Sequence, residues 1–387
     1  MTYLDHNATA PLHPELKAKV PEWLDFWGNP SSIHWAGRGP KALIRESRQK
    51  IASFLGVDPL ELIFTSGGSE ANNLALKGIL TGGALQDRDQ IIISSVEHPS
   101  VTKTALALRD IGYRVDTTKV NRDGQLDLEH YKSLLSSRTA LVSCMLANNE
   151  TGHIFPIAQM ARMAHESGAL FHCDAVQALG KIDFNLKELG VDVATISGHK
   201  FYALKGCGVL YARKGINIKS LINGGPQERG RRAGTENVLG MASLGFMCGK
   251  KAELPQEVLR LREMRDHLES RVLNEISDVR ITGASGTRLP NTSHMTIQGV
   301  DGETLLINLD VQGFAVSTGA ACSSGSPEPS PALLAMGYTR AEAQSSLRLS
   351  LGWQNEMSDV DAFVDTLKTV VTRLRGFKHG EQFAYGV

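Results

Sequence analysis

The sequence has no excess of charge of either sign. Lysine plus arginine and aspartate plus glutamate both number 41 in a chain of 387 residues, so the formal net charge is zero. Proteins that bind nucleic acid or an anionic membrane through their overall electrostatic field carry a clear positive excess. Its absence favours small molecules or other proteins as partners.

Cysteine is scarce, and its spacing excludes two common uses. The five cysteines are an odd number and include no C-x-x-C pair. This pattern predicts neither a disulfide framework nor a structural zinc site, so we expect no bound metal. They are Cys144, Cys173, Cys207, Cys248 and Cys322.

Targeting segments are also missing. Residues 1–6 lack the basic and apolar regions of a secretory signal peptide, and no apolar run is long enough to span a bilayer. We therefore expect a protein of the reducing cytoplasm.

Short apolar runs alternate with helical stretches between about residues 40 and 250. Strands separated by helices predict an α/β fold with a mainly parallel sheet sandwiched by helices. A helix is expected over Arg38–Leu55, ending at Gly56. The expected strands are Leu62–Phe64, Gln90–Ser94, Arg114–Thr117, Ala140–Leu146, Ala169–Cys173, Asp192–Ser197 and Gly208–Tyr211.

The length of the chain predicts more than one domain. We expect a large cofactor-binding domain over residues 15–251. A long charged segment with helical spacing then runs over Leu254–Ile276. Residues 1–14 and 252–387 are expected to form a smaller α+β domain.

Chemically useful residues follow two of the predicted strands. Lys200 ends the sequence S-G-H-K, and Asp174 ends another apolar strand. Open α/β sheets bind ligands at the carboxyl ends of their strands. A lysine there can form a Schiff base, and an aspartate can pair with the pyridine nitrogen of pyridoxal phosphate. Taken singly, the two residues also fit a surface lysine and a helix N-cap.

Residues 62–72 read as a strand, a glycine turn and a helix. The backbone amides at Gly68 and Ser69, with the helix dipole, would hold a phosphate. The segment is neither a Walker motif nor a dinucleotide fingerprint, and an ordinary capped turn is the alternative. Two further strands lead to polar clusters that contain His98 and Asn149.

In their order along the chain, these motifs resemble the cysteine desulfurases of the class V aminotransferase group of pyridoxal-phosphate enzymes. The segments are G-G-S-E, V-E-H, N-N-E-T-G, H-C-D-A-V-Q and S-G-H-K, together with residues 3–9, 28–32, 231–235 and 346–352. The resemblance covers nearly the whole chain. It implies the fold of the type I pyridoxal-phosphate transferases.

The resemblance also implies a role for each site residue. Lys200 would carry the cofactor, Asp174 would pair with the pyridine nitrogen and His98 would stack on the ring. Gln177 and Asn149 would contact the phenolic oxygen. The phosphate would be held by Gly68, Ser69, Ser197 and His199, joined by Thr235 from the second subunit of a homodimer. Arg348 would bind the substrate carboxylate, with Asn7 close by.

Cys322 differs from the other cysteines in its surroundings. It lies among small residues and prolines over residues 317–331, whereas Cys144 and Cys173 lie in apolar runs typical of a core. This context predicts an exposed, reactive thiol on a loop. In the family, this position receives sulfur from L-cysteine, leaving L-alanine, and passes it to an acceptor such as an iron–sulfur scaffold protein.

Three other functions stay open at this point. An aminotransferase or a selenocysteine lyase of the same fold would use much of the same site. The chain could also be a sulfur-relay scaffold with little turnover of its own, although Lys200, Asp174 and Arg348 argue against that.

Overall fold

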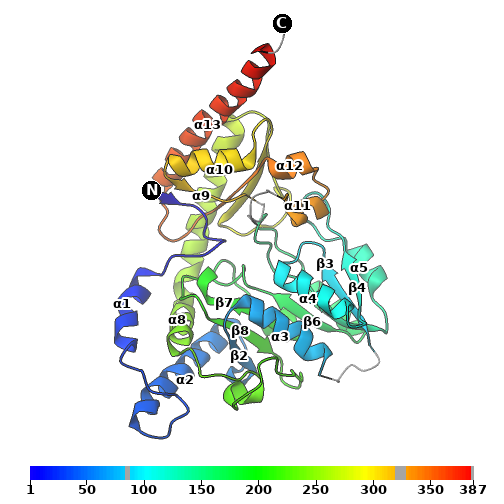
Figure 1. Cartoon of the computed structure of the whole chain (residues 1–387), viewed down its shortest axis with the longest axis vertical. Coiled ribbons are helices and arrows are strands. Elements are labelled where there is room, and N and C mark those ends of the chain that lie inside the picture. The colour runs from blue at the N-terminus through cyan, green and yellow to red at the C-terminus, as the bar shows by residue number, and fades with distance from the viewer. Residues whose placement is uncertain (83–87, 319–327, 385–387) are drawn as a thin grey trace.

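The computed structural model describes residues 1–82, 88–318 and 328–384 (Figure 1). Within this part of the chain, no helix is long and apolar enough to cross a membrane. The same residues contain no group of three or more histidine, cysteine, aspartate or glutamate side chains placed to hold a metal ion.

A seven-stranded sheet with the order β2-β8-β7-β6-β5-β3-β4 forms the centre of the larger part of the molecule. β8 alone runs opposite to the other six strands of this sheet, so the predicted α/β fold with a mainly parallel sheet is confirmed. The strands are β2 (Leu62–Thr65), β3 (Gln90–Ser94), β4 (Arg114–Thr118), β5 (Thr139–Ser143), β6 (Leu170–Asp174), β7 (Val193–Ser197) and β8 (Gly208–Ala212).

Helices cover both faces of this sheet because successive strand residues point to opposite sides. Ile91 and Ile93 pack into a cluster with α3 and α4, whereas Ile92 packs into the larger cluster with α2, α6 and α8. The helices of this part are α1 (Pro14–Trp23), α2 (Trp35–Leu55), α3 (Gly68–Leu80), α4 (Pro99–Arg109), α5 (Leu128–Leu134), α6 (Ile157–Glu166), α7 (Leu186–Leu189) and α8 (Val238–Cys248).

The predicted end of α2 at Gly56 has a clear physical cause. Gly56 adopts a left-handed conformation with φ +72°, which glycine tolerates best, and its amide donates to the last turn. A β-carbon there would also lie 2.3 Å from the Asn185 side chain. The helix begins at Trp35, three residues before the predicted start.

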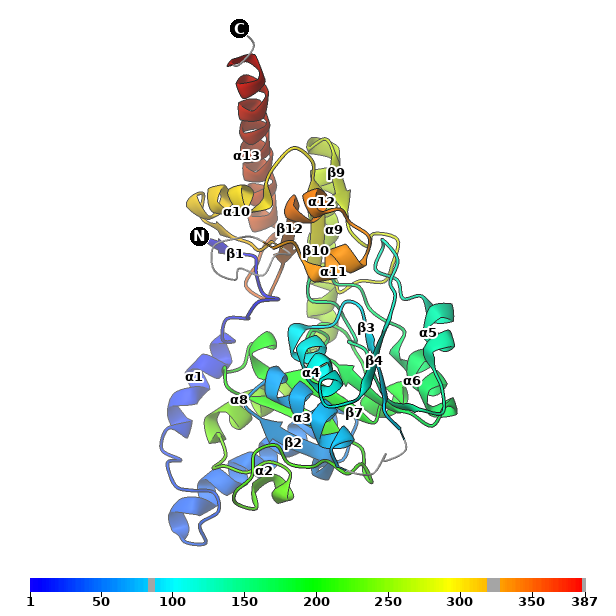
Figure 2. The same ribbon diagram turned by 45° about the vertical axis from the view of Figure 1, so that its right-hand side comes forward.

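A second apolar core lies above the large sheet in Figures 1 and 2, around the antiparallel sheet β12-β10-β9. Leu4 joins this core, so the N-terminal arm packs with the C-terminal part of the chain. The helix α13 extends away from the body in both views. The expected domain division near residue 252 stays a prediction. The elements here are β1 (Thr2–Tyr3), α9 (Leu254–Glu275), β9 (Val279–Ile281), β10 (Thr292–Ile297), α10 (Gly302–Val311), β11 (Phe314–Ala315), α11 (Pro331–Ala335), α12 (Arg340–Gln344), β12 (Ser346–Ser350) and α13 (Met357–Ala384).

Candidate active site

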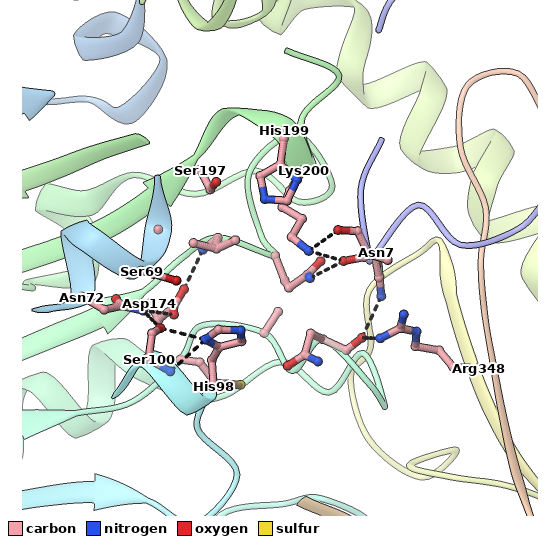
Figure 3. Close-up of a pocket in the computed structure, with 17 residues that line it drawn as sticks. Asn7, Ser69, Asn72, His98, Ser100, Asp174, Ser197, His199, Lys200 and Arg348 are labelled. Carbon is pink, nitrogen blue, oxygen red and sulfur yellow. Dashed lines mark hydrogen bonds between the residues drawn. The ribbon is translucent and has the colours of Figure 1, made fainter. Parts of the chain in front are cut away.

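A cavity of about 360 Å³ lies where the strand ends of the large sheet meet the N-terminal arm and β12. In Figure 3, Asp174 and Arg348 lie at opposite sides of this cavity, and Lys200 and His98 lie between them. Most of the predicted site residues line it, namely Asn7, Gly68, Ser69, His98, Asn149, Asp174, Gln177, Ser197, His199, Lys200 and Arg348.

Lys200 ends the short 3₁₀ turn Gly198–Lys200 that follows β7. Its amine donates to the backbone oxygens of Asn7 and Ala8, each at 2.6 Å. Burial disfavours the charged amine and the nearby Arg348 repels it, which together lower the pKa of Lys200 to about 8. Lys200 is therefore not an ordinary surface lysine.

Asp174 is the last residue of β6, and its carboxylate is held from two sides. Oδ2 accepts a hydrogen bond from Asn72 Nδ2 at 2.8 Å, and Oδ1 accepts one from the Val176 amide at 3.0 Å. No long helix follows it, so the N-cap alternative does not apply. The carboxylate has a fixed orientation at one wall of the cavity.

His98 precedes α4 and accepts a hydrogen bond from the Ser100 amide at its Nδ1, over 3.1 Å. The Ser100 hydroxyl lies 2.7 Å from the same nitrogen. These contacts orient the ring and leave Nε2 available to a ligand. Desolvation by the surrounding protein lowers the pKa of His98 below its ordinary value, so the neutral imidazole is favoured.

The start of α3 has the features of an anion site. The first amides of a helix have no acceptor within it, and α3 begins at Gly68. The Ser197 hydroxyl is buried nearby without a hydrogen-bond partner among the described residues. A β-carbon on Gly68 would lie 3.5 Å from that of Ser197. The predicted phosphate ligands are therefore grouped in one place, with His199 also lining the cavity.

Arg348 lies in the middle of β12 and is almost fully buried. Its Nη2 donates to the Asp5 carboxylate at 2.6 Å and its Nη1 to the Asn149 backbone oxygen at 3.2 Å. Its Nε has no partner among the residues described. Asp5 was not among the site residues predicted from the sequence, although it lies in one of the matching segments.

Lys181 is the second residue that the sequence analysis missed. Its amine donates to Asn7 Oδ1 at 2.7 Å and to Gln177 Oε1 at 2.6 Å, behind the wall of the cavity. Gln177 Nε2 in turn donates to the Asn7 backbone oxygen at 3.0 Å. The only signal in the sequence is its position four residues after Gln177.

Two predicted residues remain, and only one of them is described by the structure. Thr235 is exposed and does not line the cavity, while Arg232 nearby is anchored by a two-point contact with Glu70. Cys322 lies outside the described residues. Ser317, which precedes Cys322 in the sequence, is described. Its backbone exchanges two hydrogen bonds with the backbone of Arg348.

Known proteins resemble this chain over nearly its whole length. The family model described as "Aminotransferase class-V" matches residues 2–363. A "Cysteine desulfurase" from Trichormus azollae is 42% identical over 388 residues, covering 98% of this chain and 96% of that protein.

Solved structures agree with this match. A "NIFS-LIKE PROTEIN" superposes with a TM-score of 0.90 at 34% identity, covering 96% of this chain and 99% of the other. A structure titled "SspA in complex with cysteine" superposes with a TM-score of 0.80 at 30% identity, covering 91% and 99%. The chain therefore belongs to the class V aminotransferase family of pyridoxal-phosphate enzymes.

Proposed function

We propose that the chain is a cysteine desulfurase, which converts L-cysteine to L-alanine and takes up the sulfur on Cys322. The observation that carries this proposal is that Lys200 and Arg348 line one cavity. An amine of lowered pKa and a buried guanidinium suit a cofactor aldehyde and a substrate carboxylate, the two anchors that an α-amino acid substrate needs. Relatives named cysteine desulfurases and a cysteine complex of a similar fold support cysteine as the substrate.

The residues present fit pyridoxal phosphate. The unpartnered Ser197 hydroxyl and the free amides of α3 would hold the phosphate. Lys200 would attach covalently, and the oriented Asp174 carboxylate would face the pyridine nitrogen. When bound, the cofactor supplies an electron sink that stabilises negative charge at the substrate Cα.

The protein's own groups would then bind the substrate and move its protons. Arg348 would bind the carboxylate, because its guanidinium keeps donors that Asp5 and Asn149 do not use. Lys200 would take the proton from Cα, for which its lowered pKa is suitable. His98 would take part in proton transfer at the sulfur of cysteine through Nε2, which carries the proton of the neutral ring because Nδ1 accepts from the Ser100 amide.

Cys322 would receive the sulfur. Its sulfur would form a bond to the sulfur of cysteine as the carbon–sulfur bond breaks. The bonding electrons would stay on Cβ, where one proton completes the methyl group of alanine. Cysteine and one enzyme thiol thus give alanine and one enzyme persulfide, with no external oxidant or reductant. A sulfur-acceptor protein, such as an iron–sulfur scaffold, would then remove the outer sulfur.

We also propose a homodimer with shared sites. Thr235 is exposed, which suits a residue that completes the phosphate site of a partner. Large apolar side chains are exposed together between α1 and α2, namely Leu24, Trp27, Ile33 and Trp35. Light scattering should give twice the mass of one chain. Mixed Lys200→Ala and Thr235→Ala protomers should regain about one cofactor site per dimer, since one site of each mixed dimer is intact.

Measuring products tests the proposed activity. Purified protein with L-cysteine and a thiol reductant should release alanine and sulfide in equal amounts. An aminotransferase would instead give a keto acid, and a sulfur-relay scaffold would give neither product. A selenocysteine lyase would prefer selenocysteine in direct competition. The predicted cytoplasmic location stays a prediction, which fractionation of the native cells would check.

A further inference from the structure

Lys181 is a buried lysine behind the cavity, with only 6% of its surface exposed. It is not part of the cavity wall, so it can act on a ligand only through other residues. Its amine donates to two side-chain amide oxygens, those of Asn7 and Gln177. Burying an amine is costly unless its hydrogen bonds are made, which indicates that these contacts are structurally fixed.

We propose that Lys181 is a positioning residue that sets the orientation of the Asn7 and Gln177 amides. An amine next to an amide oxygen donates to it, and the amide nitrogen must then point elsewhere. This holds for both the charged and the neutral amine, since each has at least two N–H donors. Lys181 thereby decides which end of each amide is turned toward the active site.

Gln177 shows the first consequence. With its oxygen on Lys181, its nitrogen donates to the backbone oxygen of Asn7. The same backbone oxygen accepts the hydrogen bond from the Lys200 amine at 2.6 Å. The Lys181 contact therefore stabilises the acceptor that holds Lys200 before the cofactor binds.

Asn7 shows the second consequence. With its oxygen on Lys181, its Nδ2 donates to Thr292 Oγ1 at 2.9 Å and to the Asn149 backbone oxygen at 3.1 Å. That Asn149 oxygen also accepts from Arg348. Lys181 is thus connected, through one asparagine, to the groups that hold both Lys200 and Arg348.

The test uses two measurements that depend differently on the proposed function. Affinity of the apoprotein for pyridoxal phosphate does not require desulfurase activity, whereas KM for cysteine does. Lys181→Met should weaken cofactor affinity about ten-fold, the size of one lost hydrogen bond. It should also raise KM if the chain is a desulfurase. Lys187→Met, at an exposed lysine six residues away, is the matched control and should change neither.

Variants that keep polarity separate positioning from packing. Lys181→Arg keeps the donors and should recover most of the cofactor affinity, with room from the adjoining cavity of about 310 Å³. The amide of Lys181→Gln can either donate to the Asn7 and Gln177 amides or accept from them. This variant should therefore fold, but it should no longer fix the orientation of these amides and should lose cofactor affinity. In a Gln177→Leu background, Lys181→Met should have a smaller effect, because only the contact with Asn7 is then left to lose. Unchanged cofactor affinity in Lys181→Met, or in Lys181→Gln if the methionine variant is unstable, would overturn the proposal. If Lys181→Met changes cofactor affinity and the wild type does not turn over cysteine, the positioning role of Lys181 stands and only the proposed desulfurase activity is rejected.

Discussion

Arg348 and Asp5 are 343 positions apart in the sequence and form an ion pair at 2.6 Å in the wall of the active site. The Arg348 side chain is 8% exposed and that of Asp5 is 18% exposed, so water screens the pair only weakly. A substrate carboxylate that binds Arg348 must share it with this internal carboxylate.

Asp5→Asn should lower KM for cysteine about five-fold. Asparagine can still accept from Arg348, but a hydrogen bond between charged groups is about 1 kcal/mol stronger than one with a neutral partner. Weaker internal pairing leaves the guanidinium freer for the substrate. Asp359→Asn is the matched control, because Asp359 contacts the same N-terminal arm at Thr2. A raised KM in Asp5→Asn would show that Asp5 supports substrate binding and does not compete with it.

Arg348→Lys should cost about 2 kcal/mol in kcat/KM for cysteine, because lysine keeps the charge and loses the planar pair of donors. Cysteamine lacks the carboxylate, so its poor reaction should hardly change. The two substrates should be compared by the rate of sulfide release. If Arg348→Lys lowered kcat/KM equally for cysteine and cysteamine, Arg348 would not be the residue that binds the substrate carboxylate.

Lys200→Ala should abolish covalent attachment of the cofactor. The purified variant should lose the visible absorption of the attached cofactor, and borohydride should fix no cofactor to the chain. Lys205→Ala changes an exposed lysine five residues away and should behave as wild type. A borohydride adduct mapped to another lysine would reject the assignment.

The reactivity of Lys200 should rise as pH increases through about 8, because only the neutral amine is nucleophilic. Arg348 lowers this pKa and Asp5 raises it. Arg348→Met should therefore move the midpoint upward, and Asp5→Asn should move it downward. Acetylation of the apoprotein, read by mass spectrometry with Lys205 as internal reference, measures both shifts. Shifts in the same direction would contradict this electrostatic assignment.

Cys322→Ala should keep cofactor binding and release almost no alanine or sulfide from cysteine. In the wild type, the peptide containing Cys322 should gain roughly 32 Da, the mass of one sulfur atom. Cys207→Ala is the control, since burial raises the pKa of Cys207 to about 12 and keeps it protonated. A persulfide mapped to Cys207, or normal turnover without Cys322, would contradict the proposed sulfur acceptor.

The sequence predicted the seven strands of the large sheet, because strands depend on local patterns. Its errors lie where burial continues beyond a strand. The apolar run after β5 was predicted as strand up to Leu146, but the assigned strand ends at Ser143. Cys144 and Leu146 remain buried, and their amides still donate to backbone oxygens of β6. The apolar sequence therefore looks like a strand beyond the point where the strand ends.

Asp5 and Lys181 were missed for a different reason. Lys181 meets Asn7 across 174 positions, and Asp5 meets Arg348 across 343. No periodicity or local motif reports such contacts, which arise only when the N-terminal arm folds back over the sheet. Cavity residues such as Asp174 and Lys200 lie at strand ends and can be predicted from local patterns, whereas Asp5 and Lys181 contact the cavity residues only through the tertiary fold.

The backbone pairing of Ser317 with Arg348 fixes the start of the segment that leads to Cys322 beside the residue proposed to bind the substrate carboxylate. Cys322 is five positions after Ser317 in the sequence, so their Cα atoms can be at most about 18 Å apart. A thiol confined to such a radius has an effective concentration in the millimolar range, whatever the concentration of enzyme. In the proposed function, sulfur uptake would then be a first-order event within the protein, and residues inserted after Ser317 would slow it by lowering this effective concentration.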